Sequence, residues 1–273
     1  MALIPPFFLD CVVAIGFPET AGSKKWNASG FLYGKLVEDE SAEEKTYELF
    51  LVTNRHAFEG YEKAFIRFNP KADEAARDYE LMLVESGELK WHAHPDLDVD
   101  VAVISINARF LRKNDIQFNY FRSDEHLADR ERASELGLTE GDTIFVLGFP
   151  MGLVGKERSF VIVRTGCIAR IRDALLGSSR ELLIDAPVFP GNSGGPVVTK
   201  PEGGYSRDTG SQQSISDWHG HILPPLSRRC CELSDRNAAD CFRGEFRFGI
   251  CPAHGLYSGN DPDTFDTSQV KKG

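Results

Sequence analysis

The sequence predicts an all-β fold of two packed antiparallel β-barrels, and three observations lead to it. Residues 11–106 divide into short apolar or β-branched segments separated by turns, which favours a barrel over alternating β/α units. Residues 143–188 contain three more segments of the same kind. A charged stretch separates the two groups, so we expect one barrel on each side of it and a short helix in the connection.

The first barrel is expected over residues 1–115. Its opening segment, Cys11 to Phe17, is continuously apolar and predicts a buried strand. The segment Trp26 to Val37 combines aromatic and β-branched residues with glycines, which is typical of a bent barrel strand. After a charged hairpin tip at 38–45, further strands are predicted at 47–52, 63–68, 80–84, 89–92 and 99–106.

Residues 116–142 are interpreted as the linker between the barrels. They are rich in charge, and 123–138 are compatible with a helix. The second barrel is expected over 143–202, with strands at 143–149, 159–171 and 181–188.

Composition excludes several classes of function. The chain has 273 residues and a net charge of −10 without a Lys/Arg cluster, which argues against nucleic-acid binding. No apolar run approaches the ~20 residues that span a membrane. The first residues lack the basic segment and cleavage site of a signal peptide. Only Cys11 and Cys167 precede residue 230, so we expect reduced thiols and a cytoplasmic location.

The stretch from Phe189 to Val198 carries the strongest chemical signal. Ser193 stands between glycines, which let backbone N–H groups turn toward a developing oxyanion and let a substrate carbonyl approach. An ordinary glycine-rich turn is the plain alternative. The pattern G-x-S-x-G also occurs in the nucleophile elbow of α/β-hydrolases, but that elbow needs a following helix, and Pro196-Val197-Val198 favours a strand.

His56, Asp100 and Ser193 follow one another along the chain, each at the end of a predicted strand or in a loop. A serine hydroxyl becomes a good nucleophile when an imidazole accepts its proton and a buried carboxylate orients that imidazole. Each residue alone has a structural explanation, and Asp100 is one of three acids together with Asp96 and Asp98. Their combined context points to nucleophilic catalysis.

Three blocks of sequence resemble the signature blocks of trypsin-like serine peptidases, in their bacterial, HtrA-like branch. They are Val52-Thr53-Asn54-Arg55-His56-Ala57, Asp100-Val101-Ala102-Val103-Ile104 and Asp185-Ala186-Pro187-Val188-Phe189-Pro190-Gly191-Asn192-Ser193-Gly194-Gly195-Pro196. The resemblance covers about residues 10 to 200. It implies a serine endopeptidase that cleaves peptides or proteins without a cofactor.

The resemblance also implies a role for each matched residue. His56 is expected to be the general base, Asp100 its orienting acid and Ser193 the nucleophile. The N–H groups of Gly191 and Ser193 are expected to form the oxyanion hole. Asn192 and Pro187 are assigned to substrate binding, with Pro187 at the base of the primary pocket. Because Pro187 is uncharged, a small or aliphatic substrate side chain is expected there.

One other pattern in the sequence could bind a ligand. His92 and His94 form an H-x-H pair that could bind a metal, but no further ligand completes a site, so a surface pair is favoured. Neither a metal nor a membrane partner is expected, and a regulatory protein partner is left open.

Residues 203–273 do not continue the family pattern, which would supply two more strands. They contain four cysteines, and nothing from Ser206 to Gly273 predicts a strand. Reading the implied codons of residues 217–256 from their second base permits text that alternates apolar and polar residues. We therefore hypothesise a shifted reading frame that leaves the tail poorly ordered and the second barrel incomplete. The alternative is a divergent tail carrying Cys and His for a metal.

An incomplete second barrel would also change the function. The alternative to an active peptidase is then a catalytically impaired barrel that binds peptides or acts as a scaffold. The nucleotide sequence tests the hypothesis of a shifted frame.

Overall fold

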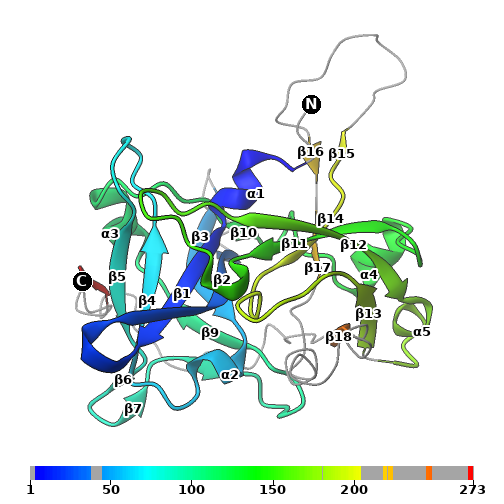
Figure 1. Cartoon of the computed structure of the whole chain (residues 1–273). Helices are drawn as coiled ribbons and strands as arrows, with labels where there is room; N and C mark the ends of the chain where they lie inside the picture. The colour runs from blue at the N-terminus through cyan, green and yellow to red at the C-terminus, as the bar shows by residue number, and fades with distance from the viewer. Residues whose placement is uncertain are drawn as a thin grey trace.

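The computed structural model describes residues 4–37, 45–179, 181–203, 218–219, 221–223, 244–247 and 270–272. These residues form a mostly antiparallel β structure with two principal sheets and a few short helices (Figure 1). The predicted all-β, double-barrel fold class is confirmed.

The first sheet is built on long antiparallel neighbours. Its strand order is β19-β5-β4-β1-β2-β3-β9-β8, and β10 pairs with β2 outside this path. The bounds are β1 (Val12–Pro18), β2 (Lys24–Val37), β3 (Thr46–Thr53), β4 (Lys63–Phe68), β5 (Arg77–Met82), β8 (His92–Ala93), β9 (Ala102–Ser105), β10 (Phe121–Arg122) and β19 (Val270–Lys272).

Most predicted strands of this sheet are present, with one region rearranged. The segments expected at 80–84 and 89–92 are instead β5, a small hairpin of β6 (Val84–Glu85) with β7 (Glu88–Leu89), and β8. The first residues of β5 are charged and so do not resemble a strand in the sequence. In the structure one of them, Asp78, pairs with Arg67 on the neighbouring β4 at 3.0 Å.

The second sheet has the order β17-β14-β11-β12-β13-β18. Its strands are β11 (Thr143–Gly148), β12 (Ile162–Arg170), β13 (Glu181–Asp185), β14 (Val197–Thr199), β17 (Ile222–Leu223) and β18 (Gly244–Arg247). Within the described ranges no pairing joins β17 to β18, so this sheet does not close on itself there.

The expectation that no strand follows Ser206 is wrong. β17 and β18 lie on the two edges of the second sheet, β19 lies on the edge of the first, and β16 (Trp218–His219) pairs with β15 (Glu202–Gly203). Strand edges offer unpaired backbone groups, and a segment can satisfy them without alternating side chains. The rest of the predicted tail lies outside the described residues, and the shifted frame stays a hypothesis.

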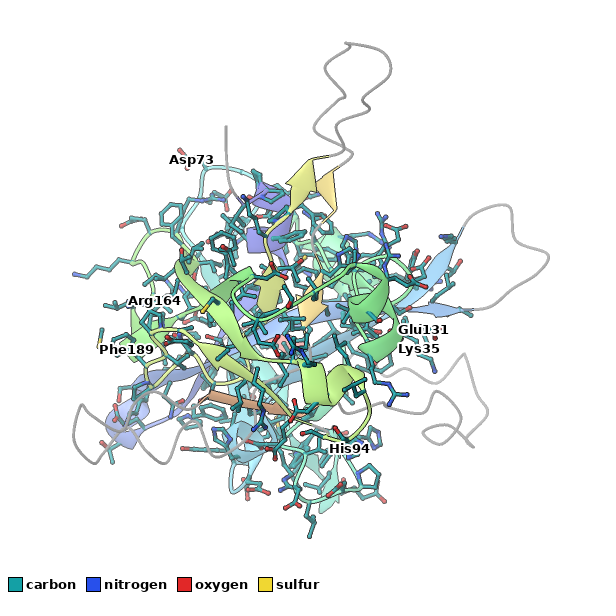
Figure 2. All side chains as sticks on the ribbon, turned by 90° about the vertical axis from the view of Figure 1, so that its right-hand side faces the viewer. Lys35, Asp73, His94, Glu131, Arg164 and Phe189 are labelled. Carbon is teal, nitrogen blue, oxygen red and sulfur yellow. The ribbon has the colours of Figure 1, made fainter. Side chains whose placement is uncertain are left out.

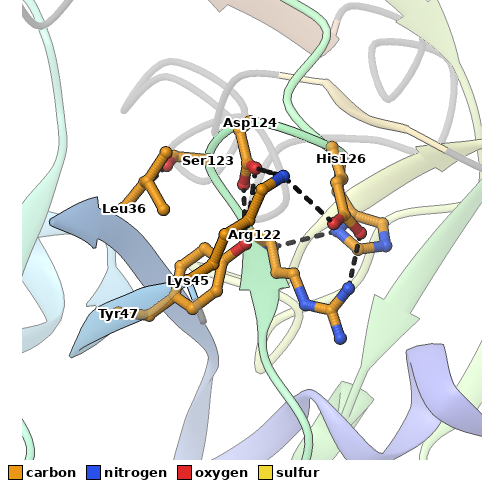
Figure 3. A network of polar contacts seen from close by, with 8 residues as sticks. Leu36, Lys45, Tyr47, Arg122, Ser123, Asp124 and His126 are labelled. Atoms are coloured by element: carbon orange, nitrogen blue, oxygen red, sulfur yellow. Dashed lines mark hydrogen bonds and ion pairs between the residues drawn. The ribbon is translucent and has the colours of Figure 1, made fainter. Parts of the chain in front are cut away.

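The predicted linker, residues 116–142, is bound to the first sheet by strand pairing and by hydrogen bonds. Phe121 of β10 pairs with Tyr33 of β2. Next to it, the Ser123 hydroxyl accepts a hydrogen bond from the Leu36 N–H, and Asp124 accepts one from Lys45 Nζ at 2.6 Å (Figure 3). These bonds leave only α4 (Arg130–Glu135) as helix within the expected 123–138 segment.

The remaining short elements lie at strand ends. They are α1 (Pro6–Asp10), α2 (Arg55–Phe58), α3 (Ala108–Lys113), α5 (Arg172–Leu175) and the 3₁₀ turns η1 (Thr20–Gly22) and η2 (Pro150–Gly152). Within the described part of the chain, none of the helices combines the length and apolar character that a membrane span requires.

Among the residues described, three apolar clusters make up the core, and one of them joins the two sheets. One cluster fills the first sheet around Leu32, Leu51 and Ile66, and another fills the second sheet around Ile144, Val146 and Leu182. We call the third the inter-barrel cluster; its buried members are Phe8, Cys11, Val12, Ala14, Phe31, Val52, Phe121, Phe145, Leu147, Phe149, Val198 and Ile222. The segments that carry the candidate site residues follow β3 and precede β9 in the first sheet and precede β14 in the second.

Candidate active site

His56 lies on a single helical turn that follows β3 directly. The residues next to His56 in sequence bond this turn, α2, to the loop that precedes β9. Asn54 Nδ2 donates to the backbone oxygen of Asp100 at 2.7 Å, and the buried Arg55 guanidinium donates to the oxygen of Leu97 at 2.7 Å. The two residues before His56 therefore tie the segment that carries the imidazole to this loop.

Asp100 holds His56 through both carboxylate oxygens. Oδ1 accepts the backbone N–H of His56 at 2.9 Å, and Oδ2 is hydrogen-bonded to Nδ1 of the imidazole. The Asp100 side chain is 1% exposed and that of His56 is 24% exposed, so the imidazole alone reaches solvent. This geometry fixes the ring orientation and leaves Nε2 directed away from Asp100.

The pKa of Asp100 lies below its ordinary value. Burial by itself raises this pKa, but the hydrogen bonds from His56, the charge of His56 and the nearby Arg55 together outweigh burial. Asp100 is therefore ionised in the folded chain. The neighbouring Asp98 is exposed, which separates the two candidate acids.

The serine loop turns sharply and docks on the His56 segment. The N–H of Asn192 donates to the oxygen of Phe189, and the N–H of Gly195 donates to the oxygen of Asn192. Gly194 adopts φ +82°, and a Cβ there would lie 2.1 Å from Thr53 Oγ1 and 2.9 Å from the nitrogen of Asn54. The residue after Ser193 thus packs against the residues that lead into His56, and His56 itself is bonded to Asp100. The joint role of His56, Asp100 and Ser193 stays a prediction.

Two peptide planes in this loop decide where its N–H groups point. The oxygen of Pro190 accepts the N–H of Met151 at 2.6 Å. In a trans peptide the C=O and the next N–H point in opposite directions, so the Gly191 N–H points away from Met151. The bond from Gly195 to the Asn192 oxygen orients the Ser193 N–H in the same way.

Gly191 is the residue that this arrangement requires. Its φ is +97°, and a Cβ would lie 2.5 Å from the oxygen of Phe149 and 2.9 Å from the nitrogen of Met151. Met151 itself has φ +54°, an uncommon conformation for a side chain that is not glycine. Close backbone packing therefore defines the candidate oxyanion hole.

The two residues assigned to substrate binding differ in exposure. Pro187 is exposed just after β13. Asn192 is 1% exposed, and its side-chain oxygen and nitrogen have no hydrogen-bond partner among the described residues. The Asn192 side chain is therefore turned into the protein, and its part in substrate binding stays a prediction.

The sequence reasoning overlooked Ser29, which lies on β2 and is fully buried. Its backbone N–H donates to the oxygen of Ser193 at 2.8 Å, and its hydroxyl donates to the oxygen of Gly191 at 2.7 Å. Its only mark in the sequence is a small polar residue beside Gly30, which does not reveal the distant partners.

The H-x-H pair does not form a metal site in the described part of the chain. His92 is exposed on β8, and Nδ1 of His94 (labelled in Figure 2) accepts the N–H of Asp96. No group of three potential ligands occurs among the described residues.

The sequence matches the model of the trypsin-like peptidase domain family over residues 28–204, so the chain belongs to this family. The resemblance carried by the three sequence blocks is thereby confirmed. No curated protein matches the sequence.

Two solved structures are similar to the chain. The MamO protease domain from Magnetospirillum magneticum, in its apo form, is 14% identical, with 88% of this chain and 92% of that chain covered and a TM-score of 0.48. The HtrA-type protease "AlgWS227A with tripeptide" is 20% identical, with 79% of this chain and 56% of that chain covered and a TM-score of 0.40. This chain thus covers little more than half the length of the HtrA-type protease chain.

Proposed function

We propose that this chain is a serine endopeptidase that hydrolyses peptide bonds through His56, Asp100 and Ser193. The observation that carries the proposal is the pairing of both Asp100 oxygens with His56, while the Ser193 loop packs against Thr53 and Asn54. A buried ionised carboxylate on Nδ1 fixes the tautomer in which Nε2 can accept a proton.

The reaction follows from these positions. Ser193 Oγ attacks the carbonyl carbon of the scissile bond while its proton passes to His56 Nε2. The negative charge that develops on the carbonyl oxygen is stabilised by the N–H groups of Gly191 and Ser193. His56 then protonates the leaving amine as the C–N bond breaks, which leaves the acyl group on Ser193. Water attacks this acyl-enzyme while His56 accepts its proton, and the C–Oγ bond breaks as His56 returns the proton to Ser193 and the acid product is released. No cofactor takes part.

We also propose that the primary pocket takes a small or aliphatic side chain. Pro187, the residue six positions before Ser193, carries no charge that would select lysine or arginine. Peptide substrates that differ at this one position would test the preference, and faster cleavage after lysine than after alanine or valine would contradict it.

A fluorophosphonate probe tests the central proposal, because it labels an activated serine. We expect one label per chain on the purified full-length protein and none on Ser193→Ala. Ser159→Ala is the matched control: this serine is also buried, and its hydroxyl has no partner within the described residues.

Absence of labelling from a folded chain would contradict the proposal. It would favour the alternative of a peptide-binding or scaffold barrel that retains the triad residues without their activity. Circular dichroism of the same sample establishes whether the chain is folded.

A further inference from the structure

Ser29 occupies a buried position between the serine loop and the turn beside it. Its hydroxyl donates to the oxygen of Gly191 at 2.7 Å and accepts the N–H of Phe149 at 2.9 Å. Its backbone N–H donates to the oxygen of Ser193 at 2.8 Å. One residue of the first sheet therefore contacts both loop residues whose N–H groups would stabilise an oxyanion.

The bonds of Ser29 complement those of Met151. The peptide before Gly191 is oriented by the Met151 N–H, which donates to Pro190, and the peptide after Gly191 is oriented by the Ser29 hydroxyl. Both peptides that flank the Gly191 Cα are thereby fixed. Glycine adopts positive and negative φ with similar ease, so its own backbone does not select the orientation seen here.

Ser29 is also connected to the segment that leads to His56. Thr53 Oγ1 donates to the backbone oxygen of Ser29 at 2.8 Å, and a Cβ on Gly194 would lie 2.3 Å from that same oxygen. The segment carrying the general base and the loop carrying the nucleophile thus share one buried partner. A displacement of Ser29 would change their relative position.

We infer that Ser29 is a positioning residue: it fixes the peptide after Gly191, and this keeps the loop from rotating about Gly191 and moving the Gly191 N–H, in the preceding peptide, out of the oxyanion hole. Without the hydroxyl, the oxygen of Gly191 is left buried without its donor, which favours rotation of the loop to find another. An oxyanion-hole donor that moves out of place loses its effect on the transition state while leaving ground-state binding almost unchanged. This inference rests on the proposed peptidase function.

The first test is hydrolysis of p-nitrophenyl butyrate by Ser29→Ala. We expect kcat per labelled serine to fall about 10- to 100-fold with KM unchanged, in the range that small misplacements of catalytic groups produce. Ser29→Cys, which keeps a side chain of similar shape with a weaker donor, should give an intermediate rate. Ser159→Ala is the matched control and should retain the wild-type rate.

A second variant disturbs the same bond without removing the hydroxyl. A Cβ on Gly148 would lie 2.7 Å from Ser29 Oγ, so Gly148→Ala should displace this hydroxyl and lower kcat in the same direction. If both variants keep the wild-type kcat per labelled serine, the inference is wrong. If Ser29→Ala lowers only the fraction of chains that are labelled, and not kcat per labelled serine, Ser29 acts on folding alone and the inference is also wrong.

The Gly191 amide resonance in ¹⁵N-labelled protein separates this inference from the proposed function. We expect this resonance to shift in Ser29→Ala and to stay in place in Ser159→Ala. If the wild-type chain is not labelled by fluorophosphonate but the resonance still shifts, the peptidase proposal fails and the positioning by Ser29 stands. If the wild-type chain is labelled and neither the resonance nor kcat changes, the inference about Ser29 fails alone.

Discussion

Burial distinguishes the two aspartates that could orient His56. Asp100 is 2% exposed and is bonded by both the backbone and the ring of His56, whereas Asp98 is exposed a short distance away on the same loop. Burial raises the pKa of Asp100, and its bonds to His56 more than reverse that effect. The residue therefore stays charged at more acidic pH than a solvated aspartate would.

Replacing Asp100 by asparagine should leave the fold in place and abolish most of the activity. The amide keeps the size of the side chain but has only one acceptor for the two donors of His56. We expect kcat for p-nitrophenyl butyrate to fall by about 10⁴-fold, as when a triad carboxylate loses its charge. Asp98→Asn is the matched control and should keep the wild-type rate; equal losses in the two variants would contradict the assignment of Asp100.

Gly194 packs tightly against β2 and against the segment that leads to His56. In Gly194→Ala the new Cβ would lie 2.1 Å from Thr53 Oγ1 and 2.3 Å from the oxygen of Ser29, at φ +82°. Gly60 has nearly the same φ, +83°, but nothing lies within 4 Å of its Cβ position. Gly60→Ala thus reports the backbone strain alone, which is roughly 1–2 kcal/mol.

We expect Gly194→Ala to lower the free energy of unfolding by at least about 2 kcal/mol more than Gly60→Ala, because it adds steric overlap with backbone atoms. It should also lose fluorophosphonate labelling. Urea titrations of the two variants check the difference in stability, and equal midpoints would show that the serine loop does not pack against β3 as described here.

At the scale of elements, strands with continuous apolar character could be predicted and contacts between distant segments could not. β4 has the predicted bounds of 63–68, and β1 and β3 differ from prediction by one residue at each end. The helix expected within 123–138 covers only α4, because the start of that segment is bonded to β2 through the Ser123 hydroxyl. Ser29 could not be recognised because its loop partners, Phe149 and Gly191, lie 120 and 162 residues away.

The loop before β11 anchors the start of α5 through one carboxylate. Glu140 Oε1 accepts the N–H groups of Arg172 at 3.0 Å and Ile171 at 3.1 Å. These backbone hydrogen bonds lower the pKa of Glu140 to about 2. Because the pKa is lower in the folded chain than in the unfolded one, the ionised carboxylate stabilises the fold above about pH 4.5, and this contribution is lost as the pH falls toward 2.

Glu140→Gln should therefore be less stable than the wild type at neutral pH and similar to it in acid. The amide retains an acceptor oxygen but carries no charge, as does a protonated glutamate. We expect the difference in thermal unfolding midpoint to be constant from pH 7 to pH 5 and to shrink between about pH 4.5 and pH 2. A difference that stays constant over the acidic range would contradict this role for the carboxylate.

At the scale of the whole molecule, the inter-barrel cluster joins the two sheets into one core. Phe121 is fully buried within it, although its strand, β10, lies in the segment that was expected to be only a linker. Its ring contacts Phe8 and Phe31 edge to face at centroid distances of 5.4 and 5.9 Å. Residues from β11 and β14 complete the same cluster, so both sheets share the apolar surface that Phe121 covers.

Phe121→Ala should consequently destabilise both sheets. We expect the free energy of unfolding to fall by about 3–5 kcal/mol, the usual cost of removing a buried phenylalanine ring. Phe160→Ala is the matched control, because that ring is 69% exposed and its removal should cost about 0.5 kcal/mol or less. Hydrogen exchange followed by mass spectrometry should show faster exchange in both β4 and β11 of Phe121→Ala, since losing a shared core weakens each sheet that rests on it. Faster exchange confined to β4 would show instead that the two sheets are stabilised independently and that this cluster does not hold them together.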